Sequence, residues 1–140
     1  GLLLVDQDGA KEFVSQHHHA VLATRRRDGS PQLSPILVGS DADGNLVVSS
    51  RETAVKVRNL MRDPNYDLAV FTNNFFGAWI SIRGRAQVVH LPDALPGLEQ
   101  YYRSVSGEHP DWDEYRAAMV EQRRVLLVLS IEDVGPKVSG

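Results

Sequence analysis

Six segments rich in apolar and β-branched residues alternate with polar turns, and this pattern predicts antiparallel β-strands. Asp28-Gly29 and Asp43-Gly44 mark the first two turns, because these dipeptides favour tight hairpins. The fifth segment has the clearest alternation, and Gly84 within it predicts a bulge or bend in a barrel wall. The six predicted strands are residues 20–26, 31–41, 45–50, 66–72, 78–90 and 124–134.

Helical patterns are predicted before the first strand, between the third and fourth strands, and between the fifth and sixth strands. One short helix is predicted over residues 9–18 and a second over residues 53–61, which Pro64 follows as a helix-stopping residue. Apolar residues spaced by three and four give the second helix a face that we expect to pack on the sheet. That face is formed by Val57, Leu60 and Met61. Two further helices are predicted after the fifth strand, beginning near Asp93 and after Pro110.

Together these elements predict a mainly β, α+β fold: a six-stranded antiparallel split β-barrel with inserted helices. An open α+β sheet is the alternative. Residues 1–140 are expected to form a single domain, without repeats or linkers. The sixth strand is almost entirely apolar over residues 125–129, which predicts cover on both of its faces. A second copy of the chain is a common cover in small domains, so a homodimer is expected.

Composition narrows the possible functions. The chain is 42% hydrophobic and 24% charged, as expected for a domain with a real core. Its net charge of −3 argues against an electrostatic nucleic-acid binder. The absence of cysteine excludes disulfides, thiolate nucleophiles and cysteine-ligated metals. No apolar run approaches the roughly 18 residues of a membrane-spanning helix, so no membrane association and a cytoplasmic location are expected.

The junction between the third strand and the second helix carries the strongest chemical signal. A helix start has backbone N–H groups without partners and a partial positive charge. Thr53 is the predicted N-cap there, and Lys56 and Asn59 follow at spacings of three. Ser49, Ser50 and Arg51 precede the helix. Such a corner can bind a phosphate, although a simple cap with a solvated cationic face explains the same residues.

Other polar clusters favour structural roles. His17, His18 and His19 are adjacent and cannot converge on one ion, so no metal site is predicted. Haem ligation through His90 or His109 lacks a recognisable pattern. Asp111 followed three residues later by Glu114 is a capping-box arrangement, which we prefer to an acid–base pair.

The chain resembles the split-barrel flavin- and deazaflavin-binding proteins related to pyridoxamine 5′-phosphate oxidase, and within them the actinobacterial branch that uses coenzyme F420. The resemblance covers nearly the whole chain. Its most specific parts are the K-x-x-N-L-x-x-D-P helix that begins at Lys56 and the later GEHPDWDEYR…RRVLL segment. It is supported by AVLATRRRDGSPQLSPI and SIRGRAQV, in the same order.

This resemblance implies a homodimer similar to FMN-binding split barrels, with a cofactor at each end of the interface. The phosphate-bearing tail is expected at Ser49, Ser50, Arg51, Thr53, Lys56 and Asn59. The ring is expected over Pro35, Ile36, Leu37 and Val38, with Ile36 and Val38 excluding water and Trp79 as a wall. Related chains often carry a basic residue two places before the helix lysine, where this chain has Ala54.

The resemblance favours an F420-dependent oxidoreductase that transfers a hydride from reduced deazaflavin to an unsaturated small-molecule acceptor. Two alternatives remain: an FMN-dependent oxidase or reductase with the same fold, and a non-catalytic carrier of F420 or flavin. The catalytic residues are unassigned. A backbone N–H, Tyr101 or Tyr115 of a partner chain, or solvent are the candidate proton donors.

Overall fold

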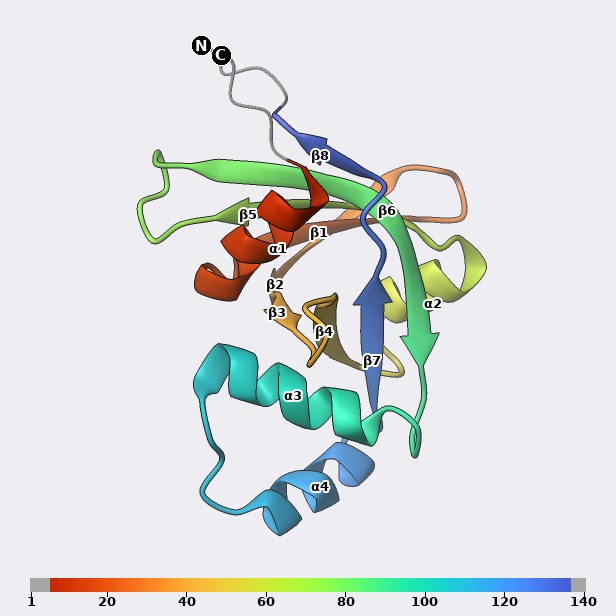
Figure 1. Ribbon diagram of the computed structural model, residues 1–140. Coiled ribbons are helices and arrows are strands. Elements are labelled where there is room, and N and C mark those ends of the chain that lie inside the picture. The colour runs from red at the N-terminus through yellow and green to blue at the C-terminus, as the bar shows by residue number, and fades with distance from the viewer. Residues whose placement is uncertain (1–5, 137–140) are drawn as a thin grey trace.

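A computed structural model describes residues 6–136; the first five and last four residues of the predicted domain lie outside this range. The described part is built from an antiparallel sheet and four helices (Figure 1). The helices are α1 (Gln7–Gln16), α2 (Val55–Arg62), α3 (Leu95–Ser106) and α4 (Trp112–Glu121). The strands are β1 (His19–Arg25), β2 (Pro31–Leu37), β3 (Gly39–Ser40), β4 (Leu46–Arg51), β5 (Asn65–Phe71), β6 (Trp79–Val89), β7 (Arg124–Leu129) and β8 (Asp133–Gly135).

The sheet is strongly curved into a half-barrel. Its neighbouring strands follow the order β2-β1-β5-β6-β7-β4-β3, and the pairs are antiparallel. The two ends of this path, β2 and β3, are joined by the single residue Val38, whose N–H donates to the His18 carbonyl at 2.9 Å. The predicted α+β class and antiparallel barrel-like sheet are therefore confirmed.

The predicted number of six strands is wrong, because the path contains seven and a short eighth strand, β8, pairs with β6. The segment predicted as residues 31–41 divides at Val38, where the chain leaves β1 and turns to pair with β4. The segment predicted as residues 124–134 divides after Leu129. The first division occurs where the chain changes its partner strand, which local sequence does not report. At the second, β7 and β8 both pair with β6 but with different stretches of it, residues 86–89 and 81–83.

Gly84 lies near the bend in β6 where this strand changes its partner from β5 to β7. Residues 79–85 of β6 pair with β5, whereas residues 86–89 pair with β7. Figure 1 shows β6 bending over the barrel between these two halves. A Cβ at position 84 would collide with the backbone carbonyl of Ser130. The predicted bend is therefore present, and glycine is required by the close approach of two backbones.

The barrel interior holds the main core, and both faces of β7 are covered by the chain itself. Val125 and Leu127 point into the barrel core. Leu126 packs on the other face with Tyr115 and Met119 of α4. Figure 1 shows α3 and α4 together beneath this end of the sheet. The second cover of the last apolar strand is thus a helical layer of the same chain, so this strand supplies no argument for a dimer.

Helix α2 begins two residues later than predicted. Its N-cap is Ala54, which makes no side-chain capping bond, so the predicted cap at Thr53 is wrong. Val57 and Leu60 pack in the core as expected, but Met61 is 61% exposed. The buried face of α2 is formed by Val57, Asn59 and Leu60, and position 61 falls on the solvent side.

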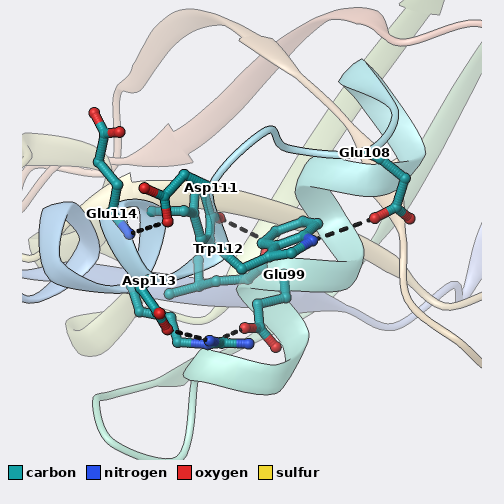
Figure 2. Close-up of polar contacts among 9 residues, drawn as sticks. Glu99, Glu108, Asp111, Trp112, Asp113 and Glu114 are labelled. Atoms are coloured by element: carbon teal, nitrogen blue, oxygen red, sulfur yellow. Dashed lines mark hydrogen bonds and ion pairs between the residues drawn. The ribbon is translucent and has the colours of Figure 1, made fainter.

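The connection between α3 and α4 is fixed by polar contacts (Figure 2). Asp111 is the N-cap of α4 and accepts from the Glu114 N–H at 3.1 Å, which confirms the predicted cap. The reciprocal bond of a capping box is replaced, because the Asp111 N–H donates to His109 Nδ1 at 2.9 Å. Trp112 Nε1 donates to Glu108 at 3.2 Å. Arg116 bonds to Asp113 on its own helix and to Glu99 on α3. These contacts hold the two helices against the outer face of β4 and β7.

Candidate functional site

Three cations gather where β4 ends, α2 begins and β7 begins. Arg51 and Arg124 are direct register partners on the antiparallel strands β4 and β7. Lys56, in the first turn of α2, lies close enough to Arg124 for the two charges to interact. We call Arg51, Lys56 and Arg124 the cation corner.

The cation corner has no carboxylate partner. Within residues 6–136, no ion pair involves any of its three members. Burial and then Arg124 lower the pKa of Lys56 below its usual value. The pKa of Arg124 is also lowered, by burial and then by Arg51. Like charges placed opposite one another destabilise a sheet, so the corner is electrostatically complementary to an anion.

The predicted tail residues are divided between two faces of β4. Ser49 and Arg51 lie on the outer face of the strand, the same face as Arg124. Ser50 is 3% exposed and alternates into the barrel interior opposite Val125. Thr53 is exposed beside the helix start. The structure thus brings Ser49, Arg51 and Lys56 to one corner, whereas the Ser50 side chain points away from it.

Asn59 is committed to a buried network. Its Nδ2 donates to Thr24 Oγ1 at 3.1 Å, and its Oδ1 accepts from Arg62 at 3.0 Å. Asn59 is 5% exposed and Thr24 is fully buried. Asn59 therefore serves the docking of α2 in this structure, because its side-chain amide is already bonded at both ends.

The segment predicted to lie under a ring also alternates between faces. Ile36 packs against the core and Val38 is completely buried within it. Both side chains turn toward the barrel interior, and their role of excluding water above a ring stays a prediction. Pro35 and Leu37 are exposed on the outer face of β2, and Leu37 is 42% exposed. Neighbouring side chains of a strand point to opposite faces, so Ile36 lies on the inner face and Pro35 and Leu37 on the outer face.

Trp79 lies in the same cross-strand row as Leu37. The register runs from Leu37 through His19 and Phe71 to Trp79, so all four side chains share the outer face of the sheet. Trp79 is 46% exposed and lines a hollow of about 350 Å³ with Phe71 and Phe75. Leu37 on β2 and Trp79 on β6 lie at opposite ends of this row. Trp79 could therefore border a ligand that lies over β2 and β1 only at the side nearest β6.

Tyr101 of α3 connects the two predicted regions. Its hydroxyl donates to the Leu37 carbonyl at 2.8 Å. The pKa of Tyr101 is raised by burial, while a backbone hydrogen bond from Ser49 acts in the opposite direction. One tyrosine therefore contacts both the outward β2 segment and the strand that leads to the cation corner.

A pocket of about 360 Å³ opens beside the cation corner, between α3, α4 and the outer face of β4 and β7. Its lining includes Ser49, Tyr101, Tyr102, Tyr115 and Arg124. Arg124 Nε donates to Gln122 at 2.8 Å, which orients the guanidinium at the pocket's edge. The volume and aromatic lining are typical of small-molecule sites.

Neither candidate tyrosine is free to donate a proton within its own chain. The Tyr115 hydroxyl donates to the Leu98 carbonyl at 2.7 Å, and burial raises the pKa of Tyr115 to about 12. Tyr101 is bonded to Leu37 as described. The structure therefore assigns no protonation residue.

The histidines take structural positions. His18 Nδ1 lies 2.9 Å from the Val38 carbonyl, and His109 Nδ1 accepts from the Asp111 N–H at 2.9 Å. Among residues 6–136, no three His, Asp or Glu side chains are grouped to hold a metal ion. The same part of the chain contains no helix long and apolar enough to cross a membrane.

Arg124 is the site residue that sequence reasoning missed. Arg124 supplies a second cation beside Lys56. Related chains were expected to place that cation at the position that Ala54 occupies here. No local motif reveals Arg124, because it lies 68 positions after Lys56 and reaches the corner only through the β4–β7 register. The only local hint in the sequence was the pair of adjacent arginines, Arg123 and Arg124, at the start of β7.

These residues fit the anionic end of a flavin-type cofactor. A helix start, three cations without carboxylate partners and the Ser49 hydroxyl form a donor set that matches a phosphate. Cation pKa values that are lowered in the free protein would return toward normal when an anion binds.

Two sequence comparisons identify relatives of this chain. The profile of the family described as pyridoxamine 5′-phosphate oxidase matches residues 7–137. An F420H(2)-dependent biliverdin reductase from Mycobacterium tuberculosis (strain CDC 1551 / Oshkosh) is 29% identical over 127 residues. These residues cover 91% of this chain and 85% of the reductase.

Solved structures show the same fold. A conserved hypothetical protein from Mycobacterium tuberculosis has a TM-score of 0.77 at 20% identity, covering 95% of this chain and 84% of that protein. A protein described as an F420 reductase has a TM-score of 0.66 at 20% identity, covering 89% of this chain and 94% of that protein. Since the family profile spans nearly all of the described residues, this chain belongs to the pyridoxamine 5′-phosphate oxidase family.

Proposed function

We propose that this protein is an F420H2-dependent reductase, which transfers a hydride from reduced deazaflavin to an unsaturated small-molecule acceptor. The cation corner is the observation that carries the proposal, because none of its three cations forms an ion pair with a carboxylate within the described residues 6–136. Such a corner is unfavourable in the free protein and favourable around a polyanionic tail. The 29% identity to an F420H(2)-dependent biliverdin reductase favours F420 over FMN.

The chain's own residues would bind and orient. Arg51, Lys56 and Arg124 would hold the anionic tail, so that remote binding energy positions the ring. Pro35 and Leu37, which face outward on β2, would provide an apolar surface beneath it. When bound, reduced deazaflavin supplies the hydride from its C5 carbon.

The acceptor is proposed as a conjugated compound that takes up this hydride together with one proton. Enones, quinones and tetrapyrroles share this chemistry. A tetrapyrrole belongs in the test panel because the curated relative is described as a biliverdin reductase.

A homodimer is part of the proposal. The outer face of β2, β1, β5 and β6 carries small residues, Val21, Ala69 and Ser81, in one cross-strand row. Large apolar side chains lie exposed near this row: Leu33 at 64%, Leu37 at 42% and Trp79 at 46%. Val21, Ala69 and Ser81 line a hollow on this face, and small residues flanked by exposed apolar side chains suit burial against a second copy.

The test combines binding and turnover. The protein is titrated with F420 and, separately, with FMN, and ligand fluorescence is followed. F420H2 oxidation is then monitored with the panel of acceptors. Tight F420 binding with acceptor-dependent oxidation supports the proposal. Preferential FMN binding would favour the flavin alternative, and F420 binding without turnover across the panel would favour a carrier.

A further inference from the structure

An ion pair ties together the two residues that flank the cation corner. Arg123 donates to Glu52 Oε2 from Nε at 3.2 Å, and its Nη2 lies 3.0 Å from the same oxygen. The Glu52 N–H donates to the Arg123 carbonyl at 2.9 Å. His90 Nδ1 lies 3.7 Å from the other carboxylate oxygen. Glu52 and Arg123 directly follow and precede Arg51 and Arg124, so this contact forms the next rung of the β4–β7 pair.

The backbone at Arg123 is unusual. Its φ of 53° lies in the left-handed region, and it is the one non-glycine residue within 6–136 with a positive φ. Such conformations are unfavourable for side chains other than glycine and persist where surrounding contacts impose them. The tight turn between α4 and β7 uses this conformation to begin the strand at Arg124, with its guanidinium on the outer face.

Stability alone does not account for the pair. Its side chains are 65% and 39% exposed, and an exposed ion pair contributes little to folding. A glycine at position 123 would relieve the backbone and be favoured by folding alone. The pair instead lies directly beside the Arg51–Arg124 rung, where two like charges repel one another.

We propose that Glu52 and Arg123 are positioning residues for the cation corner: their ion pair holds Arg51 and Arg124 side by side at the spacing that an anion requires. This inference rests on the proposed function, since it concerns the same corner. In this proposal Glu52 does not contact the ligand and acts through Arg123.

The variant Glu52→Gln separates positioning from simple electrostatics, because the two predict opposite signs. Removing a negative charge beside three cations would by attraction alone strengthen anion binding. Loss of positioning weakens it. We expect the dissociation constant for F420 to rise about fivefold in Glu52→Gln, a typical loss for one misplaced charge-assisted hydrogen bond. Under turnover, KM for F420H2 should rise by the same factor while kcat at saturation is unchanged.

Arg123→Gly provides the second variant. Glycine accepts the left-handed backbone, so thermal stability should be equal to or above that of the wild type, while F420 binding weakens. Glu132→Gln is the matched control, because Glu132 forms another exposed pair with Arg85, at 3.9 Å, outside the corner. Its affinity for F420 should equal that of the wild type.

Inorganic phosphate is titrated in parallel, since it reports on the corner without the ring. Unchanged or stronger binding in Glu52→Gln overturns the positioning role. If the wild type binds phosphate but not F420, the proposed cofactor fails and the positioning role is judged on phosphate alone. If the wild type binds neither, both proposals fail.

Discussion

Arg51 and Arg124 face one another across the β4–β7 pair, at the position where β4 ends and β7 begins. Two guanidinium groups in direct register repel each other, and Lys56 adds a third positive charge nearby. No carboxylate within the described residues 6–136 pairs with any of the three. The arrangement has a physical purpose only when a negatively charged group completes it.

Arg124→Gln should stabilise the free protein while weakening the bound state. Relief of like-charge repulsion should raise the free energy of unfolding by about 0.5 kcal/mol in phosphate-free buffer. Urea unfolding with and without F420 measures both effects. Arg58→Gln, which changes an exposed cation on the same helix as Lys56, is the control and should alter neither. A destabilised Arg124→Gln protein without ligand would contradict the electrostatic account.

F420 affinity should fall as the pH rises through the alkaline range. Burial and Arg124 lower the folded-state pKa of Lys56 below 10.5, so the ammonium loses its proton earlier in the free protein than in an unfolded chain. Between the two pKa values the unfolded state binds more protons, so this group makes folding more favourable as the pH rises there. An anion binds the charged form and therefore dissociates over that window. Dissociation constants measured from neutral pH upward should show this decline, and Lys56→Met should flatten it.

Gly84→Ala should destabilise the fold strongly. The added methyl group would meet the carbonyl of Ser130, a backbone atom that also accepts from the Tyr66 hydroxyl at 2.6 Å. Because neither strand can move without breaking this contact, we expect a loss of about 2–4 kcal/mol. Thermal and urea unfolding measure the loss. Gly29→Ala is the comparison for a turn glycine with open space around it, although its positive φ adds backbone strain. Equal stabilities of Gly84→Ala and wild type would contradict the crossing geometry.

Ala69→Arg should produce a monomer. Ala69 lies opposite Val21 and Ser81 in the middle of the outer row, where a long cation would have no room in an interface. Sedimentation velocity should show a dimer for the wild type and a monomer for the variant, with the circular dichroism spectrum unchanged. A monomeric wild type would remove the dimer from the account.

Much of the architecture follows from local sequence. The β1–β2 hairpin, the bend at Gly84, the core face of Val57 and Leu60, and the cap at Asp111 were all predicted from turn chemistry and periodicity. These features depend on residues within a few positions of one another.

The errors have a shared physical cause. Which face Val38 presents, where β7 finds its second cover and how Arg124 reaches Lys56 are decided by pairing between distant segments. Strand register sets the first and the third, and a register shift of one residue would reverse every side chain of a strand. The packing of α3 and α4 sets the second. The family resemblance supplied the corner's location, whereas its third cation became visible only in three dimensions.

The most direct test of the central claim is a fluorescence titration of the wild type and Lys56→Ala with F420. We expect the dissociation constant to rise about 100-fold in the variant, because the anionic tail loses a partly buried cationic partner. Thermal stability without ligand should be retained. Equal affinities for the two proteins would show that the cation corner does not hold the cofactor tail.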